Sequence, residues 1–229
     1  MSEWWSYTLE DFLLFSPRVY WRLFELHNEA VWPLQILTLL LGAAVLVLVV
    51  QPRPWSHRAI SAVLAAAWIW IAWTFLWNRY SQINWAMAYA APAFVLEALV
   101  LAWIGTLQGR LRFVASTSLV GVAGFLLLSF AVILHPVMAK LGGRGFGAAE
   151  IVGIAPDPTV IATLGLLTMA SGNVVAWLCL VVPLAWCLVS WATLYTMGAP
   201  EAWIPVSAGA VAIAVHLRSA LCKKAARLS

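Results

Sequence analysis

The chain is short of charge. Only 10% of its 229 residues are Asp, Glu, Lys or Arg, whereas 64% are hydrophobic. Soluble domains usually carry about a quarter charged residues. A soluble globular domain is therefore excluded, and nothing in the composition indicates a nucleic-acid partner.

Cysteine is also scarce, and its spacing excludes the usual uses of this residue. Cys179, Cys187 and Cys222 form no CxxC pair. The first two lie within one apolar run, where cysteine behaves as a small apolar residue. We therefore expect neither a disulfide nor a zinc site.

Motifs for known chemistry are missing as well. No lysine lies deep in an apolar run to hold retinal, and no pair of facing histidines indicates haem. The glycine-rich stretch 142–147 lacks the Lys-Ser/Thr ending of a phosphate loop. The four histidines are scattered, unlike the polar clusters of membrane enzymes. We expect no cofactor and no enzymatic activity.

Long apolar runs are abundant. A run of about 20 apolar residues is long enough to cross a hydrocarbon core of roughly 30 Å as a helix. The sequence predicts an all-α polytopic transmembrane bundle with seven spans, at residues 31–50, 59–78, 84–107, 113–139, 158–171, 174–197 and 202–217.

The fifth run decides the topology. Residues 158–171 would form a helix of only about 21 Å, so the alternative is six spans plus a re-entrant half-helix. With seven spans, one side collects five basic residues and the other eight. The positive-inside tendency then places the C-terminal tail, 218–229, in the cytoplasm. With a re-entrant segment, both termini would be cytoplasmic.

The first thirty residues form a separate amphipathic arm. Thr8 and Ser16 each resemble a helix start, and Pro17 suits the first helical position. The arm either lies in the headgroup layer or folds over the ends of the other helices. The mixed acidic and aromatic start also lacks the pattern of a cleavable signal, so we expect Met1 to be retained.

Glu97 is the most unusual residue in the chain, because it lies near the middle of the third run. An ionised carboxylate there costs several kcal/mol unless it is paired, hydrated or protonated. Glu97 is therefore a candidate ion or substrate contact. The alternative is a protonated acid that hydrogen-bonds to a neighbouring helix.

A second candidate site lies at one membrane face. With seven spans, Arg79, Asn84 and Arg144 gather on the side of the arm, where they would form a polar vestibule for a small solute. Arginine and aromatic residues at helix ends are also ordinary interface anchors.

Two further features have mainly structural interpretations. Asp157 precedes Pro158 and is expected to cap the fifth helix. His135 and Met138 are spaced three apart, so they are weak candidates for a soft-metal site. Without a second such pair, no metal is predicted.

Three stretches of sequence carry a family resemblance. They are SEWWSYTLEDFLLFSPRVYWRLFELHNEAVWPLQ, NRYSQINWA and GIAPDPTVIATLGLL. Over nearly its full length the chain resembles a prokaryotic integral-membrane family known as domain of unknown function 6064. The resemblance implies a multi-pass protein of the cytoplasmic (inner) membrane, and it supplies no catalytic residue, ligand or partner.

Two functions fit these patterns. The first is a permease for a small solute or ion, with Glu97 at the centre of the bundle. The second is a non-catalytic subunit that packs against other membrane proteins or against copies of itself. Apart from the lipid bilayer, no partner is indicated.

Overall fold

The computed structural model describes residues 14–170 and 174–225. Within these residues every regular element is a helix, which confirms the all-α class. The α-helices are α1 (Pro17–Ala30), α2 (Leu34–Val50), α3 (Ser56–Ile71), α4 (Met87–Leu101), α5 (Leu119–Ser129), α6 (His135–Leu141), α7 (Pro156–Met169), α8 (Val181–Thr196) and α9 (Trp203–Ala225). The π- and 3-10 segments are η3 (Ala72–Trp77), η4 (Tyr80–Gln82), η5 (Ala102–Leu107), η6 (Phe130–Leu134), η7 (Phe146–Ala148) and η8 (Val174–Leu180).

Five helical stretches in the described residues are long and apolar enough to cross a membrane. They are Ser56–Gln82, Met87–Leu107, Leu119–Leu141, Val175–Thr196 and Trp203–Cys222. A sixth is present if α1 and α2, which meet at a bend of 92°, count as one broken span. The chain is thus a multi-pass membrane protein by length and composition. Seven spans are not confirmed, because α7 has only 14 residues.

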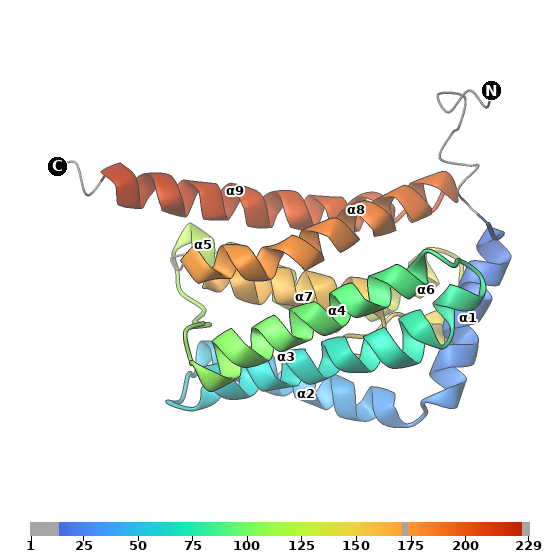
Figure 1. Cartoon of the computed structure of the whole chain (residues 1–229), viewed down its shortest axis with the longest axis horizontal. Coiled ribbons are helices and arrows are strands. Elements are labelled where there is room, and N and C mark those ends of the chain that lie inside the picture. The colour runs from blue at the N-terminus through green and yellow to red at the C-terminus, as the bar shows by residue number, and fades with distance from the viewer. Residues whose placement is uncertain (1–13, 171–173, 226–229) are drawn as a thin grey trace.

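Helix α1 lies across one end of the bundle, at the right of Figure 1. It begins where the sequence predicted, because the Ser16 hydroxyl accepts a hydrogen bond from the Val19 amide and Pro17 follows. Its aromatic face packs against η3 and η4 through Phe24–Phe75 and Tyr20–Tyr80 contacts. Residues 17–30 therefore fold over the helix ends, and the predicted start at Thr8 lies outside the described residues. We call this side, with the 78–86 turn and the 142–155 loop, the α1 end.

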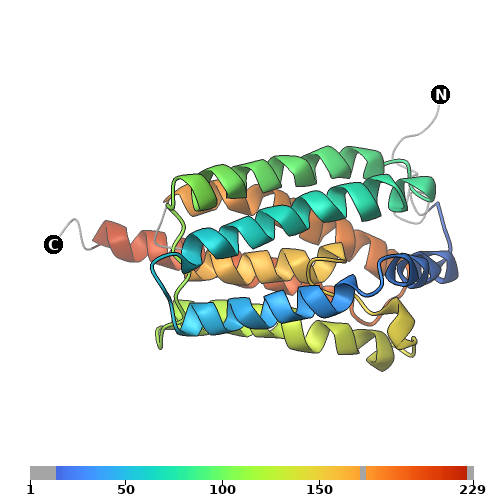
Figure 2. The same ribbon diagram turned by 90° about the horizontal axis from the view of Figure 1, so that it is seen from below.

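Helix α7 lies inside the bundle, with helices on all sides in Figure 2. All its residues from Pro156 to Thr168 are buried. It approaches α5 closely because Gly124 and Gly165 face each other, and a Cβ atom on Gly165 would lie 2.7 Å from the Gly124 carbonyl oxygen. Small residues of this kind let membrane helices pack closely. On another side of α7, Trp68 of α3 donates a 3.0 Å hydrogen bond to the Thr163 hydroxyl.

The end opposite α1 is formed by the 51–55 turn, the 108–118 segment and the C-terminal part of α9 (Figure 1). Its arginine side chains are exposed: Arg53, Arg58, Arg110, Arg112 and Arg218. We call it the basic end. Acidic residues are absent from these segments.

Candidate functional site: a buried charge cluster at the α1 end

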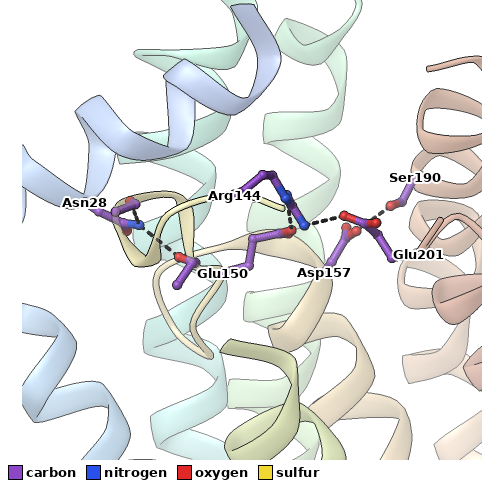
Figure 3. A network of polar contacts seen from close by, with 8 residues as sticks. Asn28, Arg144, Glu150, Asp157, Ser190 and Glu201 are labelled. Carbon is purple, nitrogen blue, oxygen red and sulfur yellow. Dashed lines mark hydrogen bonds and ion pairs between the residues drawn. The ribbon is translucent and has the colours of Figure 1, made fainter. Parts of the chain in front are cut away.

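Arg144 is the centre of a polar network enclosed at the α1 end (Figure 3). Its side chain is only 10% exposed. One guanidinium nitrogen donates a hydrogen bond to Glu201, in the turn before α9, in a close ion pair. Another nitrogen lies 4.0 Å from Glu150. The guanidinium also stacks over Trp21 of α1, 3.4 Å from the ring centroid, so cation–π attraction adds to the pairing.

The 142–155 loop brings Arg144 inward because both of its ends are anchored. Gly143 has a positive φ of 76°, which glycine adopts without steric cost, and the Arg144 amide bonds back to the Ala139 carbonyl. On the far side, Asn28 of α1 donates hydrogen bonds of 2.7 and 2.8 Å to the carbonyls of Gly147 and Ala149. Helix α1 therefore holds the loop that carries both Arg144 and Glu150.

Asp157 joins α7 to α8. Its carboxylate accepts a 2.7 Å hydrogen bond from the Trp186 indole and a 2.5 Å hydrogen bond from the Ser190 hydroxyl. The prediction that Asp157 caps its helix is wrong, because the N-cap residue is Ala155 and no side chain caps this end. The helix begins at Pro156, since proline is tolerated in a first turn where no amide donor is needed. Asp157 still lies in the first turn of α7, where a negative charge is favourable.

The cluster contains more acids than bases. Glu150, Asp157 and Glu201 are each at most 9% exposed, and among the described residues around the cavity that they share, Arg144 is the one guanidinium. The second carboxylate oxygen of Glu150 has no hydrogen-bond partner among the described residues. A small cavity of about 10 Å³ lies between these side chains, which is space for about one water molecule. Arg144, at 4.0 Å, compensates the Glu150 carboxylate only in part, so its ionisation in such a closed site has a high cost.

Burial shifts the pKa values of two titratable groups, Glu150 in the loop and His27 in α1. Burial raises the pKa of Glu150 well above its ordinary value, the charge of Asp157 adds to the rise, and Arg144 opposes it. In α1, burial lowers the pKa of His27 to about 4, and the charge of Arg79 acts in the same direction. Both groups therefore favour their uncharged forms in the folded protein.

The three residues of the predicted vestibule lie in different surroundings. Arg144 lies in the cluster, whereas the partly buried Arg79 is near His27. The Asn84 side chain accepts a 3.1 Å hydrogen bond from the Ala86 amide, so it shapes the turn before α4. All three belong to the α1 end, and their role in a solute vestibule stays a prediction.

Glu97 lies apart from the Arg144 cluster, in the second half of α4. It is 1% exposed, and one of its carboxylate oxygens has no hydrogen-bond partner among the described residues. The nearby Pro92 does not interrupt α4. Glu97 is thus as enclosed as the sequence predicted, while its role as an ion or substrate contact stays a prediction.

The two weak candidates for a soft-metal site line the small cavity. His135 and Met138 both border it, beside Arg144 and Glu150. The Nδ1 atom of His135 has no partner in the described part of the chain. The residues that the structure describes contain no group of three or more His, Cys, Asp or Glu side chains suited to a metal ion.

Sequence reasoning missed several members of the cluster. Glu201 is separated from Arg144 by 57 positions, and Trp186 and Ser190 look like ordinary residues of an apolar helix. One signal was available in the sequence. Beyond residue 30 the chain has only four acidic residues, Glu97, Glu150, Asp157 and Glu201, and all four are buried.

Comparison with known proteins identifies the family of the chain and gives no activity, substrate or partner. No curated protein and no solved structure matches the chain. Residues 17–227 match the model of the family described as "Family of unknown function (DUF6064)". Because this match covers most of the chain, including the whole Arg144 cluster, the chain belongs to that family.

Proposed function

We propose that the protein is a proton-linked permease for a small solute or ion in a prokaryotic cytoplasmic membrane. The observation that carries this proposal is the acid excess in the Arg144 cluster, where one carboxylate oxygen of Glu150 has no hydrogen-bond partner in the described part of the chain. Ionisable groups inside membrane proteins are costly and commonly form proton or ion relays. Binding of one proton to Glu150 removes that cost, and release of the proton restores it.

The position of α7 supports this proposal. In Figures 1 and 2, α7 runs from inside the α1 end towards the basic end, and α8 and α9 follow in alternating directions. In this proposal the chain crosses the membrane seven times, with α7, which follows the 142–155 loop, as the fifth crossing. Short helices that begin within the bundle are typical of transporter binding sites, and α7 places Asp157 at such a start.

The basic end favours a cytoplasmic C-terminus. Five exposed arginines lie there, and cytoplasmic loops carry an excess of basic residues. Alkaline phosphatase fused after Ser229 should therefore be inactive, whereas an insertion in the 142–147 loop should be active. The reverse pattern would overturn this orientation.

Proton flux in proteoliposomes tests the function. The purified protein is reconstituted with a trapped pH-sensitive dye, and amino acids, sugars, organic acids and inorganic cations are added in turn. At least one class should change the internal pH. Glu150→Gln should abolish the response, whereas Glu29→Gln, at a side chain that is 67% exposed, should retain it.

The competing function is a packing subunit. It predicts that no solute class moves protons and that other membrane proteins co-purify in fixed ratio in mild detergent. This pair of results would reject the permease.

A further inference from the structure

We propose that a lateral groove between α2 and α3 holds one acyl chain of a membrane phospholipid. This site is separate from the Arg144 cluster and does not depend on the permease function. The groove has a volume of about 280 Å³. For comparison, an engineered apolar cavity of roughly 150 Å³ is large enough to bind benzene.

The groove lies beside α2, of which only Gln35, Gly42, Val45 and Val49 are buried among its described residues. Leu37 and Leu41 of α2 line it and remain 52% and 37% exposed, and Trp70 of α3 is 38% exposed. The inner side is formed by Val152 of the 142–155 loop and by Ala162 of α7. An empty hollow of this kind forfeits dispersion contacts on the exposed side, so an apolar occupant stabilises it.

The residues that line the groove favour a hydrocarbon as its occupant. Apart from the indole N–H of Trp70, Thr38 is the one polar side chain among the described residues that line the groove, and its hydroxyl already donates a 3.1 Å hydrogen bond to the Gln35 carbonyl. None of the described residues that line the groove is charged. A water-soluble solute would therefore lose its hydration without gaining partners.

The dimensions fit a single lipid chain. Lining residues of α2 run from Leu34 to Val45, a length of about 16 Å along the helix. This is about half of a hydrocarbon core of roughly 30 Å, which is the depth of one leaflet.

The open end of the groove indicates where the headgroup lies. A second hollow, of about 470 Å³, shares Leu34, Leu37 and Trp70 with the groove and continues it to the α1–α2 bend. Trp32 at this bend is 65% exposed, and tryptophan is enriched at the membrane interface. A bilayer phospholipid can thus keep its headgroup at the α1 end while one chain lies between α2 and α3.

Photolabelling in nanodiscs tests the proposal. The protein is placed in phosphatidylethanolamine and phosphatidylglycerol with a diazirine in one acyl chain, and adducts are mapped by peptide mass spectrometry. We expect adducts on Val152 and Ala67 in addition to outward-facing residues such as Leu96, which is 57% exposed. Ala67→Trp fills the groove and should lose the Val152 adduct. Ala62→Trp is the matched control, because Ala62 is exposed on the same helix outside the groove.

Several outcomes would overturn the proposal. One is an unlabelled Val152 in the wild-type protein, and another is equal labelling of Val152 in Ala67→Trp. Cross-links from groove residues to a second copy, or labelling by a diazirine fatty acid but not by the phospholipid, would assign another occupant. Unchanged labelling of Leu96 establishes that the variants are folded, and Leu41→Trp provides a second way to fill the groove.

Added phospholipid provides an independent readout in detergent. It should raise the melting temperature of the wild-type protein and of Ala62→Trp, because a ligand that binds only the folded state stabilises it. Ala67→Trp should lose this shift. An equal shift in all three proteins would contradict a specific groove.

Discussion

The arginines of the basic end and the Arg144 cluster of the α1 end differ in their exposure. At the basic end, the arginines are exposed and can be solvated by water and lipid headgroups. At the α1 end, one arginine and three acids are enclosed together, so each charge depends on its neighbours. Removing an exposed charge therefore costs little, whereas removing one partner of an enclosed pair leaves an uncompensated charge.

Arg144 gives the largest expected effect. Arg144→Met leaves Glu201 without its close partner and should lower the free energy of unfolding by about 3–5 kcal/mol. Arg112→Met, at the exposed basic end, should change it by less than about 0.5 kcal/mol. Unfolding curves in a mild detergent provide the measurement. Equal stabilities for the two variants would remove the proposed difference between the ends.

Asp157 gives the next largest effect. Asp157→Ala loses the hydrogen bonds from Trp186 and Ser190 and should cost about 1.5–3 kcal/mol. Asp157→Asn keeps a side chain that reaches α8 and should be milder. Asp157→Ser can cap a helix but is too short to reach α8, so it should be as unstable as Asp157→Ala. A Ser variant as stable as the wild-type protein would instead support capping.

Glu150 makes stability depend on pH at the α1 end. Its raised pKa means that the folded state binds a proton which the unfolded state releases above its ordinary pKa of 4.5. This stabilisation is complete below that pH and is lost as pH rises through the folded pKa. Glu150→Gln should therefore weaken the loss of stability in alkaline solution.

The pH range of the measurement separates the effect of Glu150 on stability from the effect of His27. With its pKa lowered to about 4 from 6.5, His27 destabilises the fold as pH falls through this interval, and it is neutral in both states well above it. Thermal scans from pH 7 upwards therefore remove the contribution of His27, and the difference between the wild-type and Glu150→Gln curves reports Glu150. Glu29→Gln should follow the wild-type curve, and a Glu150→Gln curve that also follows it would contradict the assignment.

Glu97 is expected to give the smallest change in stability. Because one of its oxygens has no partner in the described residues, Glu97→Leu should be at least as stable as the wild-type protein. Glu97→Gln should fold normally and lose transport if the residue exchanges a proton or cation. Loss of stability in Glu97→Leu would indicate a structural hydrogen bond to a neighbouring helix.

Much of the helical framework could be predicted because hydrophobic runs determine it directly. The predicted runs at 59–78, 84–107 and 174–197 correspond to Ser56–Gln82, Met87–Leu107 and Val175–Thr196. Ser16 and Pro17 marked the start of α1 correctly because capping is a local interaction.

The polar site was less predictable because its contacts are not local. Arg144 meets Glu201 across 57 residues, and Asp157 meets Ser190 across 33. Composition and helical period carry no information about such pairs. Asp157 illustrates the limit, since a local rule assigned it to a cap while its hydrogen bonds go to another helix.

Infrared difference spectroscopy tests most directly whether the α1 end stores a proton. Spectra of the reconstituted protein at acidic and alkaline pH are subtracted, and the carbonyl band of protonated carboxyl groups is followed. We predict a pH-dependent band in the wild-type protein and in Glu29→Gln, with a component that Glu150→Gln lacks. A Glu150→Gln difference spectrum identical to that of the wild-type protein would contradict the account.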